Sequence, residues 1–323
     1  MKLKMNCYEI FKDGLKIIIK TSVPNLNTKM SQHFNGCFVI SDYNEKNIPT
    51  ELVTLDIVAE ETIEYSKNKC FIMAPNTLIF SNKKNNIKFI YDHFNADHCL
   101  NLKRIIIDIF AKYYEDIGIY FVHGASVVNK KTNKATVFIG NSGSGKTTNL
   151  LFYLLSKKYD YMGNDRIGLR YYNGKLIVYG FPSNLGLRYP TLELNYNLKN
   201  LILPYIDKEL YQKNADNCLD SKKLNLTVFN LLNAFNCKFV SKAELSEIIV
   251  TCYDKKNSMQ VFNELLDVEE IISQIERQHI SAISKEQFFL NELLKFNDHQ
   301  SDFYLSTAKI LVHKSNIFSN YSN

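Results

Sequence analysis

The chain has 323 residues, of which 46% are apolar and 22% are charged, and its formal net charge is +6. These values are typical of a globular protein with a sizeable core, and they exclude a disordered or fibrous chain. The length predicts two domains, or one large domain with appendages. Because the positive charge is weak and evenly spread, we expect no nucleic-acid partner.

Seven cysteines are scattered along the chain without a CxxC pair. This pattern is typical of reduced thiols in a cytoplasmic protein rather than of a disulfide framework. The basic start MKLKMNCYEI has no apolar segment of the kind found in signal peptides. No run approaches the roughly 18 apolar residues of a membrane span. We therefore expect a cytoplasmic protein with no membrane partner, and we leave homo-oligomerisation open.

Residues 1–95 are predicted to form a β-rich N-terminal region. Two strand-like runs, 8–11 and 15–19, flank Lys12-Asp13-Gly14, which predicts a hairpin with a three-residue loop. Further short strands are predicted over 70–73, 77–81 and 87–91. We place a domain boundary after residue 95 and assign 96–323 to a second domain.

The second domain is predicted to begin with a helix that Asp97 caps and Gly118 ends. Helices are then predicted over 147–155, through most of 190–240, and over 267–277 and 285–295. Strands are predicted over 119–122, 126–128, 135–139, 159–165, 167–171, 176–179 and 247–253. Strands and helices thus alternate in the middle of the chain, before a helical C-terminal part.

The segment Gly140-Asn-Ser-Gly-Ser-Gly-Lys-Thr147 fits the phosphate-loop pattern GxxxxGK[ST], between an apolar strand and a helix. Glycines let backbone N–H groups converge on a phosphate, and the helix N-terminus adds partial positive charge. Lys146 is expected to reach the β- and γ-phosphate oxygens, and the Thr147 hydroxyl to bind Mg²⁺. We therefore predict a site for ATP and Mg²⁺. Its nucleotide-binding residues are Gly140, Asn141, Ser142, Gly143, Ser144, Gly145, Lys146, Thr147 and Thr148.

Two short motifs flank this loop. HGAS (123–126) ends a strand before the loop, and GNDR (163–166) ends a strand after the following helix. With GNSGSGKTT (140–148), they resemble the superfamily of HPr kinase/phosphorylase and ATP-dependent phosphoenolpyruvate carboxykinase, over about residues 117–190. The resemblance implies an α/β (α+β) fold with the phosphate loop at the centre of a compact mixed sheet, beside the β-rich N-terminal region.

The resemblance also implies catalytic roles for His123, Lys146 and Asp165. Asp165 matches the general base of the kinases, and a carboxylate there could also join Thr147 in holding the metal. The chain departs from the family pattern, since Asn164 replaces the first Asp of an Asp-Asp pair and the HPr kinase signature is absent. It looks most like divergent HPr-kinase-related kinases, which implies transfer of a phosphoryl group to Ser or Thr of a peptide or protein, such as a ribosomally made peptide.

Arginines are scarce in this chain, with only five among the 39 basic residues. Three of the five, Arg166, Arg170 and Arg188, fall within one short segment. The planar guanidinium group suits bidentate contact with phosphate. These three are therefore candidates for stabilising the charge of the transition state, and we place Arg188 first.

Two other functions stay open at this point. One is a kinase for a small molecule such as free serine, and the other is a regulatory module that binds ATP without transferring phosphate. A proton acceptor at Asp165 favours a kinase over a regulatory module. The segments Asp92-His93 and Asp97-His98-Cys99 superficially resemble metal ligands, but their spacing matches no zinc pattern.

Overall fold

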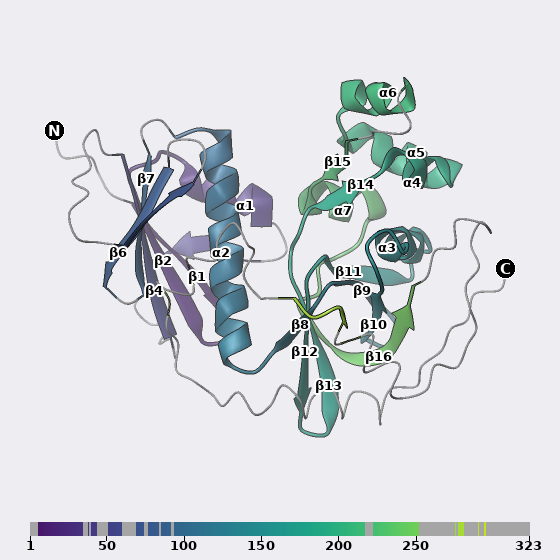
Figure 1. The fold of residues 1–323 in the computed structure, drawn as a ribbon, viewed down its shortest axis with the longest axis horizontal. Coiled ribbons are helices and arrows are strands. Elements are labelled where there is room, and N and C mark those ends of the chain that lie inside the picture. The colour runs from purple at the N-terminus through teal and green to yellow at the C-terminus, as the bar shows by residue number, and fades with distance from the viewer. Residues whose placement is uncertain are drawn as a thin grey trace. The chain divides into compact units, whose positions relative to one another are not determined.

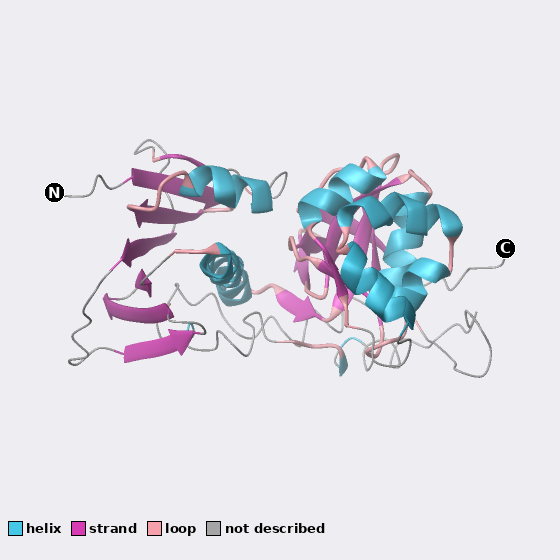
Figure 2. Ribbon diagram, turned by 90° about the horizontal axis from the view of Figure 1, so that it is seen from above, coloured by secondary structure: helices cyan, strands magenta, loops and turns pink. Residues whose placement is uncertain are grey.

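The computed structural model describes residues 6–34, 38, 40–43, 51–59, 69–73, 77–83, 85–91, 94–216, 222–251, 275, 277–280, 290 and 294. The chain divides into two compact units, Met1–Ile117 with Ser281–His299, and Gly118–Ile280 with Gln300–Asn323. Each unit combines helices with a mixed β-sheet (Figures 1 and 2), which confirms the predicted α/β class. Within the described ranges, no helix has both the length and the apolar character that a membrane span requires.

The first unit is built on a seven-stranded sheet. In chain order its strands are β1 (Asn6–Lys12), β2 (Leu15–Thr21), β3 (Ile40–Asp42), β4 (Glu51–Ala59), β5 (Lys69–Met73), β6 (Thr77–Lys83) and β7 (Asn86–Tyr91). They lie in the order β3-β1-β2-β4-β7-β6-β5. Strand β4 pairs in parallel with β2 and with β7, and the other neighbours are antiparallel.

All five strands predicted in this region are present, and the structure adds β3 and β4. The β1–β2 hairpin has a loop of two residues rather than three, because Lys12 pairs with Leu15. Both loop residues, Asp13 and Gly14, have positive φ, which is the backbone that a two-residue hairpin with the twist of its strands requires. Aspartate followed by glycine is a favoured sequence for such a turn.

Helix α2 (Ala96–Asp116) belongs to the first unit, so the units divide after Ile117 and not after residue 95 as predicted. Its apolar face is buried, and the Tyr113 hydroxyl donates a 2.8 Å hydrogen bond to the Asp13 carbonyl in the β1–β2 loop. An amphipathic helix must bury its apolar face against a sheet or another helix. Helix α1 (Leu26–Phe34) also lies in this unit and contacts α2.

The start of α2 corrects another prediction, since Asn95 and not Asp97 caps the helix. The Asn95 side chain accepts a hydrogen bond from the His98 N–H, and the His98 ring bonds in return to the Asn95 N–H. This reciprocal pair satisfies two backbone donors, whereas Asp97 lies in the first turn. Gly118, with φ +88°, follows the helix end as predicted.

The second unit contains the other seven-stranded sheet. Its strands are β8 (Tyr120–Val122), β9 (Gly124–Asn129), β10 (Lys134–Ile139), β11 (Tyr159–Asn164), β12 (Ile167–Tyr172), β13 (Lys175–Gly180) and β16 (Lys242–Val250). They lie in the order β11-β9-β10-β16-β13-β12-β8, in which only the β10–β16 pair is parallel. The predicted strands are all present, and β16 begins five residues earlier than the predicted 247.

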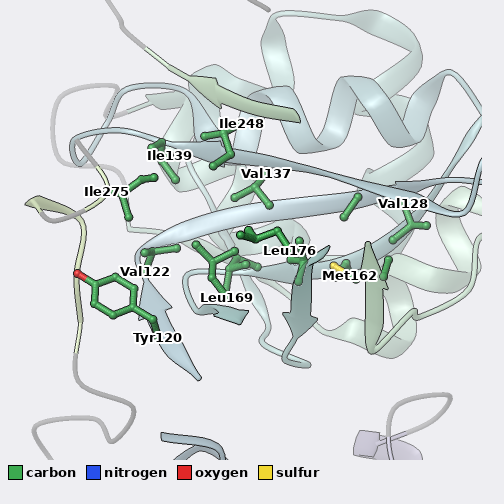
Figure 3. Close-up of a cluster of buried hydrophobic side chains, with 14 residues drawn as sticks. Tyr120, Val122, Val128, Val137, Ile139, Met162, Leu169, Leu176, Ile248 and Ile275 are labelled. Atoms are coloured by element: carbon green, nitrogen blue, oxygen red, sulfur yellow. The ribbon is translucent and has the colours of Figure 1, made fainter. Parts of the chain in front are cut away.

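This sheet curls so strongly that its edge strand β11 approaches β13. A Cβ atom at Gly180 would lie 2.2 Å from the Met162 carbonyl oxygen, so the approach requires glycine. The curl encloses a buried apolar cluster that includes Val137, Leu169 and Ile248 (Figure 3). Helix α3 (Lys146–Leu155) contacts β9, β10 and β11.

The described residues between 189 and 235 are mostly helical, as predicted for 190–240. The elements are α4 (Tyr189–Glu193), α5 (Tyr196–Ile202), the 3-10 helix η1 (Leu203–Tyr205), α6 (Lys208–Asp216) and α7 (Val228–Phe235). A small antiparallel sheet of β14 (Leu185–Leu187) and β15 (Leu224–Leu226) holds this segment together. The helices predicted over 267–277 and 285–295 fall almost entirely outside the described residues.

Candidate functional site

The loop between β10 and α3 has the backbone shape that its glycines predict. Gly140, Gly143 and Gly145 have φ values of +148°, +81° and +96°, which other residues rarely adopt. Gly145 is the N-cap of α3 and provides no side-chain cap. The first backbone N–H groups of the helix therefore have no intrahelical acceptor, which is the condition for binding an anion.

Lys146 holds its positive charge inside this loop. The residue is only 7% exposed, and its Nζ donates hydrogen bonds to the carbonyls of Gly140 (2.7 Å) and Asn141 (2.9 Å). Among the described residues, no carboxylate forms an ion pair with Lys146. Burial lowers the pKa of Lys146, and the charge of Asp165 opposes that shift. The ammonium group is therefore buried without a direct counter-ion.

Thr147 links the loop to the end of β11. Its hydroxyl donates a 3.1 Å hydrogen bond to the Asn164 side-chain carbonyl, and Asn164 is 2% exposed. The Asn164 backbone carbonyl in turn accepts a hydrogen bond from the Ser183 hydroxyl. Asp165 comes next in the chain and is exposed, with φ +67°. Asn164 therefore connects the loop to Asp165, rather than serving only as a turn residue.

The strand register brings the three predicted catalytic residues to one edge of the sheet. In the β9–β10 pair Gly124 lies opposite Ile139, and in the β9–β11 pair Ala125 lies opposite Asn164. His123 directly precedes Gly124, Gly140 directly follows Ile139, and Asp165 directly follows Asn164. All three residues therefore lie at the same edge of the sheet. His123, the loop with Lys146, and Asp165 are thus neighbours in space.

Electrostatic effects on His123 agree with this geometry. The pKa of His123 lies below its ordinary value, mainly because the ring is partly buried and also because Lys146 is positively charged. Asp165 acts in the opposite direction, and Lys223 adds to the lowering of the pKa. Histidine has an ordinary pKa near 6.5, so His123 is neutral at pH 7.

Thr251 supports the loop from the end of β16. Its N–H and its hydroxyl both donate to the Ile139 carbonyl, at 2.7 and 3.0 Å, and its hydroxyl oxygen lies 2.7 Å from Ser144 Oγ. Both hydroxyl groups belong to buried residues. A Cβ atom at Gly140 would lie 2.4 Å from the Thr251 carbonyl oxygen, so the loop passes very close to this residue. Sequence analysis missed Thr251, which fell inside the predicted strand 247–253.

Gln278 supports the loop from a different direction. Its backbone carbonyl accepts a 2.7 Å hydrogen bond from the His123 N–H, and its Nε2 donates a 3.3 Å hydrogen bond to Asn141 Oδ1. Its neighbour His279 forms an antiparallel bridge with Val122 of β8. A single glutamine at the end of a predicted helix gave no signal that could have indicated this contact.

The three candidate arginines occupy different positions. Arg166 directly follows Asp165 and is the nearest of them to the site along the chain. The Arg170 guanidinium lies over the Tyr172 ring, 5.6 Å from the ring centroid. Arg188, the N-cap of α4, is exposed, and its side chain has no hydrogen bond or ion pair with another described residue. No hydrogen bond or ion pair thus joins Arg188 to the loop among the described residues, and its role stays a prediction.

The two residues predicted to bind the metal, Thr147 and Asp165, both carry side-chain oxygen atoms. Asn164 links the two along the chain and through a side-chain contact, because it accepts a hydrogen bond from the Thr147 hydroxyl and directly precedes Asp165. In the part of the chain that the structure describes, no three or more His, Cys, Asp or Glu side chains gather as metal ligands. Of the other segments considered, Asp97-His98-Cys99 lies in the first turn of α2, whereas Asp92 and His93 fall outside the described residues.

Comparison with known proteins adds little to this geometry. No protein-family model and no curated protein matches the chain. Among solved structures, the Hpr(Ser) kinase/phosphatase from Coxiella burnetii is similar to part of it, with 16% sequence identity and a TM-score of 0.26. The match covers 45% of this chain and 73% of the Coxiella chain. A likeness this weak does not establish the family, so the functional argument rests on the residues of the site.

Proposed function

We propose that the second unit binds ATP with Mg²⁺ and transfers the γ-phosphoryl group to a hydroxyl group. The hydrogen bond between Thr147 and Asn164 is the observation that carries this proposal. It joins the phosphate loop to the residue before Asp165. A positive charge, a hydroxyl ligand for a metal and an open carboxylate thereby lie at one edge of the sheet, and phosphoryl transfer requires these three groups together.

The residues of the loop fit a nucleotide triphosphate. A buried ammonium group without a counter-ion destabilises a fold unless an anion binds to it. The phosphate oxygens of a nucleotide would supply that anion to Lys146, and the free N–H groups at the start of α3 would bind the same phosphates. A hydroxyl oxygen, as on Thr147, is a ligand of the kind that Mg²⁺ prefers, and the Asp165 carboxylate is a second candidate ligand whose role the Asp165→Asn variant tests. Mg²⁺ bound there would neutralise charge on the phosphates.

Asp165 is the residue that we assign as general base. It is exposed and forms no ion pair with another described residue, so it is free to accept a proton from an acceptor hydroxyl. His123 is held neutral by partial burial and by the charge of Lys146. A neutral imidazole can donate a hydrogen bond to a phosphate oxygen without a change in the net charge of the site.

The acceptor that we propose is a Ser or Thr side chain of a peptide or protein. The exposure of Asp165 supports this choice, because a residue on a large substrate can reach an open carboxylate. Free serine is the main alternative acceptor. Incubation with γ-labelled ATP and either a degenerate Ser/Thr peptide library or free serine separates the two. ATP binding by the wild type with transfer to neither would favour the regulatory module.

Asp165→Asn tests the assignment of the base. Asparagine tolerates the positive φ of this position and keeps the shape of the side chain, but it does not accept the proton. We expect ATP affinity to stay within about threefold and transfer to fall by roughly 10²–10⁴, the usual range for loss of a general base. Glu209→Gln, on the exposed face of α6, is the control for loss of one acidic charge.

Two other results would change the proposal. A collapse of ATP binding with unchanged chemistry per bound nucleotide would make Asp165 a metal ligand and not a base. Unchanged binding and unchanged transfer would remove Asp165 from the mechanism.

A further inference from the structure

Asn141, the second residue of the phosphate loop, is held through both its backbone and its side chain. Its backbone carbonyl accepts hydrogen bonds from Lys146 Nζ at 2.9 Å and from the Ser144 N–H at 3.1 Å. Its side-chain oxygen Oδ1 accepts the 3.3 Å hydrogen bond from Gln278 Nε2. The residue itself is exposed. Asn141 therefore has a fixed side chain on an open part of the loop.

The contact with Gln278 determines which end of the Asn141 amide is available. A side-chain amide has an acceptor end, the oxygen, and a donor end, the NH₂ group. Because Gln278 occupies the oxygen and no other described residue bonds to the Asn141 side chain, the NH₂ group is left for a ligand. This polarity matters at an anion site, since N–H groups attract phosphate oxygens and a carbonyl oxygen repels them.

Gln278 is itself buried, and its backbone is hydrogen-bonded on both sides. It is 8% exposed, its carbonyl accepts from the His123 N–H, and its own N–H donates to the Ile275 carbonyl at 3.1 Å. A buried side chain with a fixed backbone on both sides has few rotamers available. From this buried position its side-chain NH₂ group donates to Asn141.

The position of Asn141 indicates which phosphate its amide would meet. In phosphate loops the lysine reaches the β- and γ-phosphates, whereas the N–H groups at the helix start bind the α- and β-phosphates. The Lys146 ammonium lies against the carbonyls of Gly140 and Asn141. The first residues of the loop, Gly140 and Asn141, therefore lie beside the part of the site that would hold the terminal phosphate of a nucleotide.

We propose that Gln278 is a positioning residue, which orients the Asn141 amide so that its NH₂ group binds the γ-phosphate and favours ATP over ADP. The inference rests on the proposed function, because it assumes that the loop binds a nucleotide. It adds a determinant of the choice between ATP and ADP, located 137 residues from the loop along the chain.

The test measures the dissociation constants of a non-hydrolysable ATP analogue and of ADP, each with Mg²⁺, on the full chain by calorimetry. Gln278→Met keeps the side-chain volume and removes the donor. We expect it to weaken binding of the ATP analogue by about three- to tenfold, which corresponds to the typical net contribution of one hydrogen bond, with ADP binding within about twofold of wild type. Gln212→Ala, on the exposed surface of α6, is the control and should change neither constant.

Asn141→Ala keeps the test decisive even if Gln278→Met folds poorly, because Asn141 is exposed. It should show the same selective loss, and the double variant should lose no more than Asn141→Ala alone, since both residues act through one amide. Equal weakening of both nucleotides by Gln278→Met would reduce Gln278 to a structural role. An unchanged ratio of the two constants in Asn141→Ala would overturn the inference.

Failure of the proposed function would look different. In that case the wild-type chain would bind neither nucleotide. Binding of both nucleotides by the wild type, with a ratio that neither variant changes, would refute the role of Gln278 alone and leave the phosphate loop in place.

Discussion

Each of the two units buries a lysine, and the two folds treat that charge in opposite ways. In the first unit, Lys16 on β2 lies 3.2 Å from the carboxylate of Glu9 on β1, and both side chains are almost fully buried. In the second unit, Lys146 is almost as deeply buried, but its hydrogen-bond partners are two loop carbonyls. The charge of Lys16 is neutralised by a carboxylate of the same sheet, whereas the charge of Lys146 is available to a bound anion.

The difference separates a lysine that belongs to the fold from one that belongs to a site. A buried ion pair is a unit, because removal of one partner leaves the other charged and desolvated. A buried ammonium group without a counter-ion lowers the stability of the fold. Such a group is kept in a binding site because its charge attracts the ligand. Replacement of each lysine should therefore change different properties of the protein.

The largest effect is expected for Lys146→Met. Loss of the charge that contacts the phosphates should reduce ATP turnover by roughly 10²–10³ and weaken ATP binding, as for other preorganised electrostatic groups. The variant also removes a desolvated charge, so its Tm should stay within about 4 °C of wild type. Turnover, ATP affinity and thermal melting measure these effects, with Lys158→Met on the exposed surface as control. Undiminished turnover would refute the phosphate-loop assignment.

The opposite pattern is expected for Lys16→Met. This change removes the ammonium group that pairs with the buried Glu9 carboxylate, so the free energy of unfolding of the first unit should fall by about 3–5 kcal/mol. ATP affinity should stay at the wild-type value, because Lys16 lies in the other unit. Denaturant unfolding measures the loss, and Glu9→Leu combined with Lys16→Met should recover most of it. Wild-type stability in the single variant would show that the ion pair has no such role.

A smaller effect is expected for Thr251→Val, which tests the support of the loop. Valine keeps the shape of threonine but removes the hydroxyl that bonds to the Ile139 carbonyl and to Ser144. We expect a loss of about 1–2 kcal/mol in unfolding free energy, because the Ser144 hydroxyl is left buried with one partner fewer. ATP affinity should fall a few-fold. Thr251→Ser restores the hydroxyl and should restore both quantities; a serine variant as weak as valine would point to packing instead.

The smallest effect concerns pH and His123. Its pKa in the folded state lies below the unfolded value near 6.5, mainly because of burial. The unfolded chain therefore binds more protons than the folded chain between the two pKa values, and stability falls as the pH decreases through that interval. Tm measured from pH 7 down to pH 5 should fall less steeply in His123→Gln than in wild type. Parallel curves of Tm against pH for the two proteins would show that His123 does not contribute to the pH dependence of stability.

Local chemistry made much of the fold predictable. Turns with Asp-Gly or Asn-Gly and alternating apolar residues located the hairpins, because these patterns act over a few residues. The sequence placed the boundary after residue 95 because the helix after it looks the same whichever sheet it covers, whereas the compact units divide after Ile117. The curl of the second sheet depends on the approach of Gly180 to Met162, between strands that are not neighbours in the sheet.

The same distinction applies to the site. The phosphate loop, His123 and Asp165 lie within one short stretch of chain, and each adjoins a strand end that the pattern indicated. Thr251 and Gln278 contact the loop from 107 and 137 residues away, and no local pattern marks either of them. Contacts of this kind depend on which strands pair, such as the parallel β10–β16 pair that delivers Thr251 to the loop.

The division of the chain has a consequence for the order in which the protein is made. The first unit consists of Met1–Ile117 and the later stretch Ser281–His299, in which Leu290 and Leu294 are buried. A ribosome synthesises every described strand of the second sheet before it reaches that stretch. Domains fold as units during synthesis, usually starting from the N-terminus. Here we expect the opposite sequence of events: every strand of the phosphate-loop sheet is synthesised before Leu290 and Leu294, the two later buried residues of the N-terminal unit.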